Sequence, residues 1–560
     1  MVGIFAADLS KKKELISVTR RLLIFILFSL AVAAAQMPAP EAPRVYVDTT
    51  WNPPTGVTWA AHTSADFRNA LTAAQPGDTI VLDAGVTYPG YFTVPAKVNP
   101  NGKWIYITSS ALVGSSQVMR SGVQVSPTLA PYMPKIVTTT NGTSALTIAA
   151  GANHIRLAGL EITTQASSSN ALLAMAYNGN TIPDSITVDR CYIHGDETHD
   201  SHRGVEMNAS NAAVIDSYIS DIHYGTNEAQ AIGLWWTPGP LKIVDNFLSA
   251  TTQEVLFGGA GGLQNPYVPS DVEIRNNHLF KPLAWDAVGI TVAPNAKWLE
   301  KNNLEFKAAQ RVIVDSNVME NVWVAGQAGF SVLFTPLTSQ SGNNAVVDDI
   351  LFTNNVLKNV ASGFQWTSHD PACATTAGCT SPGEARRIVM RNNLILLGAT
   401  NQLQYNNGYN FAGYFTDQAT DYVFQHNTVV PPPDRNYCGG QGSISFQVKA
   451  PFDQITSHTH NVWVLDNVLC RQLSGPRGWV GQFPYVLTEY MGDPSPVEPR
   501  LYGNVLYAPV GDRVYPMPAH NYVSTVPPTY VDPANGNYQL ASPNWTDTSD
   551  GGIAGYTPNS

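Results

Sequence analysis

The chain has 560 residues, of which 13% are charged, and a formal net charge of −11. This charge excludes a general electrostatic attraction to nucleic acid or to an acidic membrane, although a local cationic cleft or a metal could still bind a polyanion. With 44 glycines and 39 prolines, the composition favours β-structure with many turns over a helical protein.

The N-terminus resembles a targeting segment. Basic residues at 11–13, 20 and 21 precede an apolar run over residues 22–32, and small residues follow before Gln36. This order predicts a secretory signal peptide over residues 1–35. An uncleaved anchor is the alternative. We therefore expect a secreted or periplasmic protein that starts near Gln36 with a linker over residues 36–56.

The first predicted elements form a capped coil. Residues 64–74 (SADFRNALTAA) predict a short amphipathic helix with Ser64 as the N-cap. PGDTIVLDAGVTYPG (76–90) then supplies the first coil, and WIYITSS (104–110) supplies another strand. The helix is expected to cover the open apolar end of the first coil.

An eight-residue pattern then recurs: apolar, any, apolar, two mostly polar residues, asparagine, any, apolar. Clear copies are VEIRNNHL (272–279), ILFTNNVL (350–357) and IVMRNNLI (388–395). Spacing between copies is irregular, which rejects a repeat of fixed length. The sixth position is held by Cys191, Ser217, Asn246, Asn277, Asn317, Asn355, Asn393, Asn427, Asn467 and Asn504, after a first copy at Leu160.

The pattern predicts an all-β, right-handed parallel β-helix over residues 57–510 with an N-terminal capping helix. Alternation turns the flanking apolar residues inward. Each asparagine is expected at a corner, in left-handed backbone, with its amide bonded to the amide one coil away. The Pro-rich tail, residues 511–560, is expected to pack on the last coils.

A second strand is expected upstream of the ladder in many coils, mixing inward apolar with outward polar residues. Its copies are GVEMN (204–208), QAIGLWW (230–236), EVLFG (254–258), NLEFK (303–307), GFSVLF (329–334), GFQWT (363–367) and ISFQV (444–448).

Five cysteines are present. An exported protein can form disulfides, and the short loop between Cys373 and Cys379 favours that pair. Cys438 with Cys470 is a second candidate pair, and Cys191 is expected as a buried free thiol.

The capped opening and the repeat resemble the pectate-lyase-like superfamily of right-handed parallel β-helices, from about Val57 to Tyr507. NLEFKAAQRVIVDSNVMEN (303–321) is similar to the family that contains chondroitinase B and alginate lyases. This resemblance implies that Lys307 is the catalytic lysine. The family has a calcium-binding carboxylate five residues before that lysine, where this chain has Asn302. The family's catalytic arginine falls in a stretch where this chain offers only Gln327.

The resemblance implies an enzyme that binds an acidic polysaccharide along an outer face, expected as a monomer. Lys307, Glu305 and Arg203 are the candidate catalytic residues, because β-elimination needs a base and a group that neutralises the uronate carboxylate. An ion pair on the surface of the strand is the alternative reading of Glu305 and Lys307.

The polar stretch HGDETHDSHRGVEMN (194–208) is expected to form a loop beside this strand. Asp196, Glu197 and Asp200 are candidate calcium ligands, since calcium prefers oxygen ligands. A solvated loop is the alternative. Trp235 and Trp366 are weighed as sugar platforms or as packing residues. Candidate substrate-binding residues are His199, His202, Glu206, His223, Gln230, Glu254, Gln327 and Trp236.

The leading functional hypothesis is a polysaccharide lyase that cleaves a uronic-acid-containing polymer by β-elimination. A glycoside hydrolase using paired carboxylates among Glu206, Glu254 and Glu305 stays open. A uronate C5-epimerase and a non-catalytic carbohydrate-binding or adhesion solenoid also stay open, because one fold carries many activities.

Overall fold

The computed structural model describes residues 37–113, 118–225, 227–285, 298–399, 412–416, 420–438, 444–447, 460–471, 500–511, 517 and 519–558. The chain divides into two compact units, Met1–Pro38 and Ala39–Ser560, and every described strand and helix belongs to the second. The predicted signal peptide lies outside the described residues. In the described part of the chain, no helix has the length and apolar character needed to cross a bilayer.

Three parallel sheets, named A, B and C, make up most of the second unit. Sheet A contains, in spatial order, β1 (Thr58–Ala61), β2 (Thr79–Leu82), β5 (Ile105–Ser109), β8 (Asn153–Ala158), β12 (Asp184–Asp189), β16 (Ser210–Ile215), β19 (Leu241–Val244), β22 (Ser270–Arg275), β25 (Ala309–Asp315), β28 (Val347–Thr353), β31 (Ala385–Arg391), β34 (Thr420–Gln425), β37 (His460–Leu465) and β39 (Leu501–Tyr502).

Sheet B contains β3 (Thr87–Pro89), β6 (Lys135–Thr138), β9 (Glu161–Thr164), β13 (Tyr192–His194), β17 (Tyr218–Ile222), β20 (Phe247–Ala250), β23 (His278–Phe280), β26 (Val318–Val322), β29 (Val356–Val360), β32 (Leu394–Leu397), β35 (Thr428–Val430), β38 (Val468–Leu469), β40 (Val505–Tyr507) and β41 (Tyr522–Ser524).

Sheet C contains β4 (Phe92–Val94), β7 (Leu146–Ile148), β11 (Leu173–Met175), β15 (Arg203–Met207), β18 (Gln230–Leu234), β21 (Gln253–Phe257), β24 (Leu304–Phe306), β27 (Phe330–Phe334), β30 (Ser362–Thr367), β33 (Gly413–Thr416) and β36 (Ile444–Gln447). Its members from β15 to β30, with β36, are the second strands expected from the sequence, so that prediction is confirmed.

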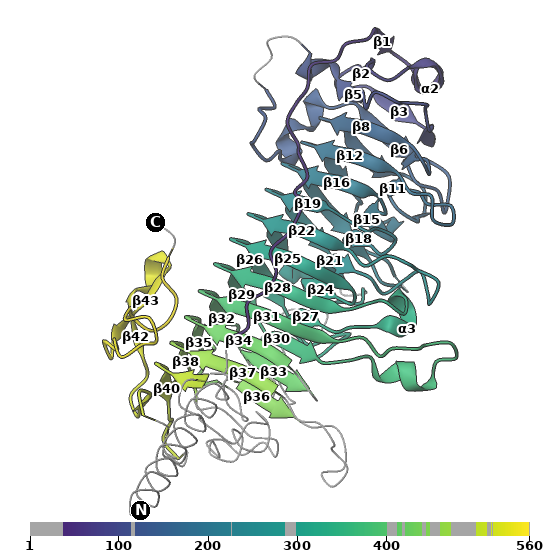
Figure 1. Cartoon of the computed structure of the whole chain (residues 1–560). Helices are drawn as coiled ribbons and strands as arrows, with labels where there is room; N and C mark the ends of the chain where they lie inside the picture. Colours follow the sequence, from purple (N-terminus) through teal and green to yellow (C-terminus); the bar gives the residue numbers. More distant parts are fainter. Residues whose placement is uncertain are drawn as a thin grey trace, which may run out of the picture. The chain divides into compact units, whose positions relative to one another are not determined.

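The chain visits the sheets in the order A, B, C and then returns to A one strand further along. For example, β22, β23 and β24 are followed by β25, which pairs in parallel with β22. Figure 1 shows the resulting stack of strands. The protein is a right-handed parallel β-helix, which confirms the predicted fold class.

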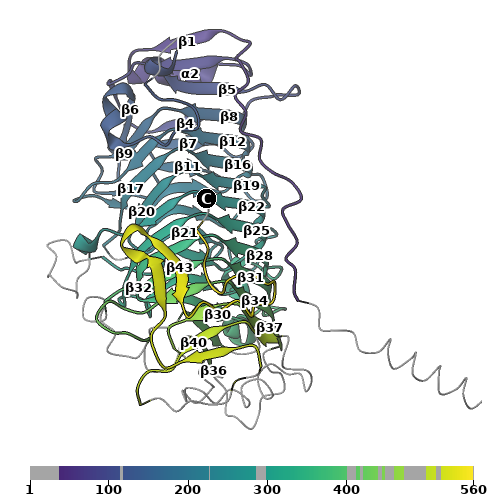
Figure 2. The ribbon, with the colours of Figure 1, turned by 90° about the vertical axis from the view of Figure 1, so that its left-hand side faces the viewer.

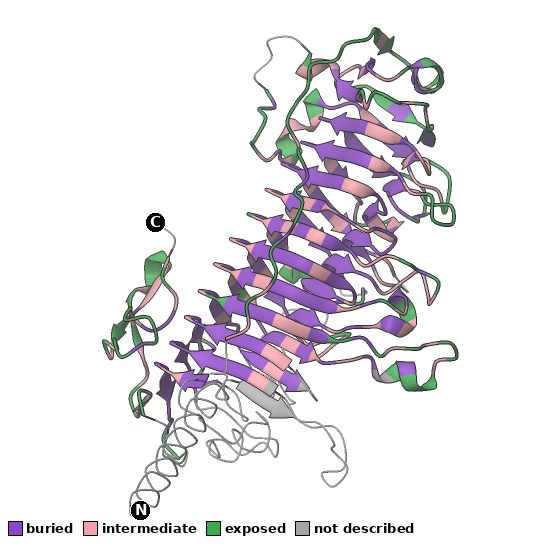
Figure 3. Ribbon diagram, in the orientation of Figure 1, coloured by how far each residue is buried: buried purple, intermediate pink, exposed green. Residues whose placement is uncertain are grey.

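The core fills the space between the three sheets. Figure 3 shows the strands mostly buried, with bands of intermediate burial, whereas exposed residues gather mainly in the connecting loops. One continuous apolar cluster runs from Ala61 to Leu506. Because neighbouring coils share it, each coil is stabilised by the coils on either side.

Helix α2 (Ser64–Ala73) packs on the first coil as predicted, with Phe67 against Tyr88 and Phe92. Its N-cap is Thr63 and not Ser64, because Thr63 and Asp66 form a reciprocal capping box. The other helical segments are α3 (Thr338–Ser341), η1 (Ser110–Leu112), η2 (Pro127–Tyr132), η3 (Leu283–Trp285), η4 (Pro371–Thr375) and η6 (Pro533–Asn535).

The predicted asparagine ladder is confirmed at the corner between sheets A and B. Each amide nitrogen from Asn246 onward donates to the amide oxygen one coil further on, at 2.9–3.1 Å, and that oxygen also accepts the backbone N–H of the earlier residue. Asn521, which the sequence pattern did not identify, extends this ladder by accepting a hydrogen bond from Asn504.

The left-handed residue at this corner was assigned to the wrong position. It is the residue before each ladder residue, with φ from 50° at Arg190 to 73° at Gly503. The side chain of the ladder residue must point inward to meet its counterpart, so the preceding residue makes the turn. Asp, Asn, Ser, His and Gly dominate the turning position because they tolerate this backbone best.

The segment before β1 lies along the outer face of sheet A, as Figures 1 and 2 show for the dark purple trace. The backbone N–H of Glu41 donates to Asp349, and the carbonyl of Thr49 accepts from Arg156. The segment expected to be a linker therefore spans the coils from β28 back to β8.

The C-terminal residues extend sheet B through β41 and then form an antiparallel pair, β42 (Thr529–Asp532) and β43 (Asn537–Ser542). Leu540 and Ala554 pack with Val468 and Val505 of the last coils. Strands β10 (Ser168–Ser169) and β14 (Asp200–Ser201) form a small separate pair.

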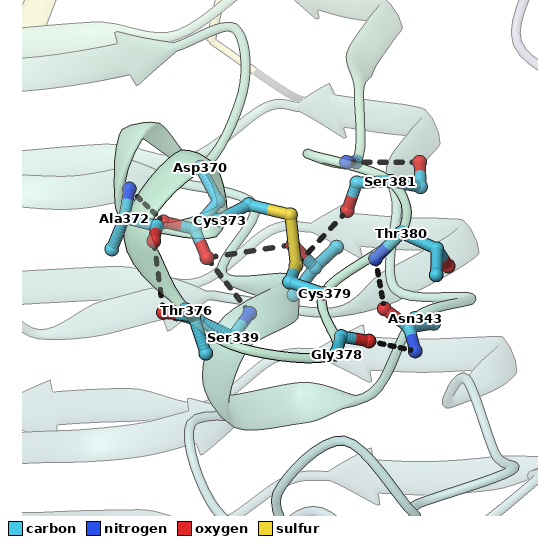
Figure 4. Close-up of a disulfide and its surroundings, with 12 residues drawn as sticks. Ser339, Asn343, Asp370, Ala372, Cys373, Thr376, Gly378, Cys379, Thr380 and Ser381 are labelled. Atoms are coloured by element: carbon cyan, nitrogen blue, oxygen red, sulfur yellow. Dashed lines mark hydrogen bonds between the residues drawn. A yellow bond between two sulfur atoms is a disulfide. The ribbon is translucent and has the colours of Figure 1, made fainter.

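Both predicted disulfides are present, and Cys191 is a buried free thiol as expected. Figure 4 shows the Cys373–Cys379 bond, which closes a loop between β30 and β31. Asp370 at the start of that loop accepts the backbone N–H of Ser339, so the disulfide loop is held against the loop of the preceding coil.

The ladder predicts the effect of removing one amide. Asn355→Ala leaves the buried donors of Asn317 without their acceptor. Each buried group left unsatisfied costs about 1–3 kcal/mol, so we expect the free energy of unfolding to fall by about 3 kcal/mol in urea denaturation. Asn101→Ala, at an exposed turn, is the matched control. Equal effects of both substitutions would show that the ladder does not stabilise the stack.

Candidate active site on the outer face of sheet C

Strands β15 to β24 of sheet C carry several predicted site residues on one outward face. Arg203 of β15 is in register with Gln230 of β18, and Glu206 of β15 is in register with Gly233. Leu256 of β21 pairs with Glu305 of β24 in the same outward row. Three strand spacings separate β15 from β24, which places Glu206 and Glu305 about 14 Å apart along the stack.

Lys307 lies directly after β24 and turns toward Glu305. Its ammonium Nζ is 3.7 Å from Glu305 Oε1, and the lysine side chain is 13% exposed. Glu305 Oε2 accepts a hydrogen bond of 2.7 Å from Gln253. A side chain at Gly259 would come within 2.6 Å of Lys307 Cδ, so glycine there leaves room for the lysine. Glu305 is thus held in place, and a small part of the Lys307 side chain remains exposed.

Arg203 reaches across the neighbouring strand. Its guanidinium lies over the ring of Trp235, 4.5 Å from the centroid, in the space left by Gly233. Nη1 is 3.3 Å from His202 Nδ1. Burial and the charge of Arg203 lower the pKa of His202 to about 4, so the imidazole is neutral at neutral pH and can accept this bond. Arg203 Nε has no hydrogen-bond partner among the described residues.

Two further residues complete the charged cluster. Lys301, before β24, forms an ion pair with Glu228, before β18. Burial raises the pKa of Glu228, but the hydrogen bond and charge of Lys301, with the charge of Lys307, bring it below its usual value. Sequence spacing gave no signal for this contact, because Glu228 and Lys301 lie two coils apart.

Aromatic rings flank the charged cluster. Trp236 stacks on Tyr177 with centroids 4.8 Å apart and ring planes within 7°. Tyr177 is 38% exposed and was not predicted. Trp366, in contrast, is buried in the core and stacks on Phe334 and Phe415, so it is a packing residue.

Glu254 does not face outward as predicted. It is fully buried and forms an ion pair of 2.8 Å with the equally buried Lys281. In the two preceding coils, Ala231 and Gly204 occupy the positions aligned with Glu254. Ala231 belongs to the apolar core. The alternation breaks at this corner, so Glu254 turns inward together with the next residue, Val255.

Glu206 lies in β15 and is nearly buried, and burial raises its pKa. Gln230 is also buried and donates to Gln253 and Glu228. His223 stacks on Trp298 at 3.9 Å and bonds to the carbonyl oxygen of Asp196. Gln327 lies half-buried in the turn before β27.

The predicted calcium loop is tied together by its own hydrogen bonds. Asp196 accepts from the backbone of Thr198 and of His199 and from the ring of His199. Despite partial burial, these bonds lower its pKa to about 2. Asp200 accepts from the backbone of Gly225, and Glu197 is exposed.

No family model matches this chain, and a search of curated proteins gives no match. Among solved structures, the chain is similar to an alginate lyase from Paenibacillus sp. str. FPU-7, with 15% identity over 70% of this chain and 99% of that chain and a TM-score of 0.38. It is also similar to the PL6 family alginate lyase AlyGC, with 12% identity over 89% of this chain and 56% of that chain and a TM-score of 0.46.

A third similar structure is PfbA, a surface adhesin of Streptococcus pneumoniae, with 9% identity over 69% of this chain and 84% of that chain and a TM-score of 0.39. Two of these proteins are alginate lyases and the third is an adhesin, and all three have low identity to this chain. The assignment of the fold therefore depends on the strand order and the ladder.

The side chains expected to bind calcium do not converge in the described part of the chain. Their one group of three possible ligands within 4.8 Å of one another is His426, Asp466 and Asp550, so Asp196, Glu197 and Asp200 do not form such a set. Within that group His426 bonds to Asp550 of the C-terminal segment at 2.8 Å. At the position implied by the family resemblance, Asn302 stands in place of a carboxylate.

The low pKa of His202 predicts how stability depends on pH. Below the ordinary pKa of 6.5, His202 becomes protonated in the unfolded state. In the folded state it becomes protonated only near pH 4. The native protein therefore loses stability as the pH falls through this window. We expect His202→Gln to lose less, measured as the change in melting temperature between neutral pH and about pH 4. A direct NMR titration that placed the pKa of His202 near 6.5 would contradict this.

Proposed function

We propose that the protein is an exported lyase that cleaves a uronic-acid-containing polysaccharide by β-elimination at the outer face of sheet C. The observation that carries the proposal is the partly exposed Lys307 beside Glu305, on the same face as the guanidinium of Arg203. A base and a cation on one rigid face are the two groups that this reaction needs most.

In the proposed reaction, Arg203 binds the carboxylate of a uronate unit. Guanidinium groups suit this role because they form paired hydrogen bonds with carboxylates. Neutralising the carboxylate makes the C5 proton more acidic. Lys307, in its neutral amine form, takes that proton, the C5–H electrons form the C4–C5 double bond, and the C4–O4 bond breaks. The leaving O4 then receives a proton, which water or Lys307 can supply.

Glu305 and Glu228 act in this proposal as positioning residues. Glu305 is held by Gln253 and contacts Lys307, while Glu228 pairs with Lys301. The proposed reaction does not use calcium, because no three His, Cys, Asp or Glu side chains of the described residues converge near Lys307. Export is proposed from the signal-like pattern of residues 1–35.

A hydrolase would need two carboxylates on opposite sides of the scissile bond. The burial of Glu254 with Lys281 removes one of the three candidate carboxylates. A C5-epimerase would begin with the same proton transfer but return a proton to C5, so its product would contain no double bond.

The decisive experiment incubates the purified protein with pectate, alginate and chondroitin and follows the ultraviolet absorbance of the unsaturated product. We expect Lys307→Ala to lower the rate by about 100-fold or more, since it removes the base. Lys358→Ala, which removes an exposed lysine of sheet B, is the matched control and should keep full activity.

Each alternative has its own signature in that assay. New reducing ends without absorbance would indicate a hydrolase, and a changed uronate composition without cleavage would indicate an epimerase. Binding without any product would indicate a carbohydrate-binding solenoid. Any of these results, or full activity of Lys307→Ala, would overturn the proposed elimination.

The aromatic pair predicts a separate effect on substrate binding. Tyr177→Ala removes the exposed ring above Trp236, so we expect KM to rise several-fold while kcat changes little, because stacking on a remote sugar is the same in the ground and transition states. Tyr91→Ala, at an exposed tyrosine near the first coil, is the control. A fall in kcat without a change in KM would contradict the stacking role.

A further inference from the structure

A lysine ammonium group is enclosed at the corner where sheet B leads into sheet C. Lys281 Nζ donates to the carbonyl oxygens of Ala250 and Thr252 at 2.9 and 3.1 Å and to Glu254 Oε1 at 2.8 Å. The side chains of Lys281 and Glu254 are both 0% exposed. The three protons of the ammonium thus match three oxygen acceptors.

The oxygen acceptors around Lys281, here called the Lys281 cage, are connected to β24, the strand directly before Lys307. The second oxygen of Glu254 accepts a bond of 2.9 Å from Asn303, the residue directly before β24. Gln253, the neighbour of Glu254, donates to Glu305. The Lys281 cage therefore fixes the start of β24 from inside the coil and contacts Glu305 through one intermediate residue.

The atoms around Lys281 are those that a hard divalent cation would take. Two backbone carbonyls and a carboxylate are typical oxygen ligands for calcium. The charge of Glu300 also acts on Lys281. Burial lowers the pKa of Lys281 and raises that of Glu254, while each partner's charge opposes that change. Nearby, both amide atoms of the fully buried Asn302 lack hydrogen-bond partners among the described residues.

We propose that the ammonium group of Lys281 is a built-in cation that replaces a bound divalent metal at the base of β24, so that the protein folds and acts without calcium. The statement about activity rests on the proposed lyase function. The statement about folding does not, because it depends only on the cage. Lys281 is a positioning residue, since it acts on Lys307 and Glu305 through Glu254, Asn303 and Gln253.

The first test uses the native full chain. We expect its melting temperature and its rate of product formation to be the same in EDTA and in excess calcium chloride. A melting temperature that falls in EDTA and is restored by calcium would overturn the proposal. Calcium binding by titration calorimetry that is abolished by Glu254→Gln would overturn it as well.

The second test empties the cage. Lys281→Ala leaves Glu254 buried without its partner and opens a space lined with oxygen atoms, so the melting temperature should fall. Calcium or methylammonium should then raise it again by occupying that space. Lys281→Met fills the space without charge, so it should be destabilised without such rescue, and Lys358→Ala should change little. Equal responses of the Ala and Met variants to both cations would overturn the proposal.

A third variant keeps the test decisive if Lys281→Ala does not fold. The double variant Glu254→Gln with Lys281→Met replaces the ion pair by neutral groups of similar size, and it should melt higher than Lys281→Met alone. A double variant no more stable than the single one would overturn the role of the charge pair. None of the melting or calorimetric measurements uses a polysaccharide, so their outcome is separate from that of the lyase assay.

Discussion

The column of side-chain amides between sheets A and B is the constraint on which the rest of the protein depends. Each amide can satisfy its donors and acceptors only when the next coil places its own amide one strand spacing away. The column is buried, so a shift in register would leave several polar groups unsatisfied at once. The residue before each rung adopts left-handed backbone, which directs the ladder side chain inward.

A stack fixed at one corner can tolerate large variation elsewhere. The connections between sheet C and the next strand of sheet A range from two or three residues to long loops such as the one closed by Cys373 and Cys379. Those loops and the outward row of sheet C carry the candidate active site. The strands therefore fix the positions of the site residues, while the loops and outward side chains can differ in chemistry without changing the fold.

Much of this architecture could be predicted because it depends on residue patterns that are local in the sequence. Alternation and the recurring asparagine identified the strands of sheets A and C, and the loop length identified the Cys373–Cys379 pair. Sheet B was not distinguished as a separate face, because its short strands directly follow the ladder. The left-handed position was assigned one residue too late, since a corner residue and its neighbour are equally polar in the sequence.

The site was harder to predict because its contacts join distant parts of the chain. Alternation placed Glu305 and Lys307 on one side, as observed. It failed at Glu254, where the corner turns two successive residues inward. Lys281 and Lys301 gave no signal, because their partners Glu254 and Glu228 lie 27 and 73 residues away. A lysine in a polar segment gives the same sequence pattern whether its side chain is exposed or buried.

The segment that lies across sheet A imposes an order on folding. Glu41 is bound by Asp349, which comes 308 residues later in the chain. A chain made from its N-terminus must therefore leave this segment undocked until the coil of β28 has formed. Because the segment crosses several coils, opening a middle coil also disturbs contacts made by coils that do not touch it. A solenoid whose repeats otherwise interact only with immediate neighbours thereby acquires a longer-range coupling, and its unfolding should become more cooperative.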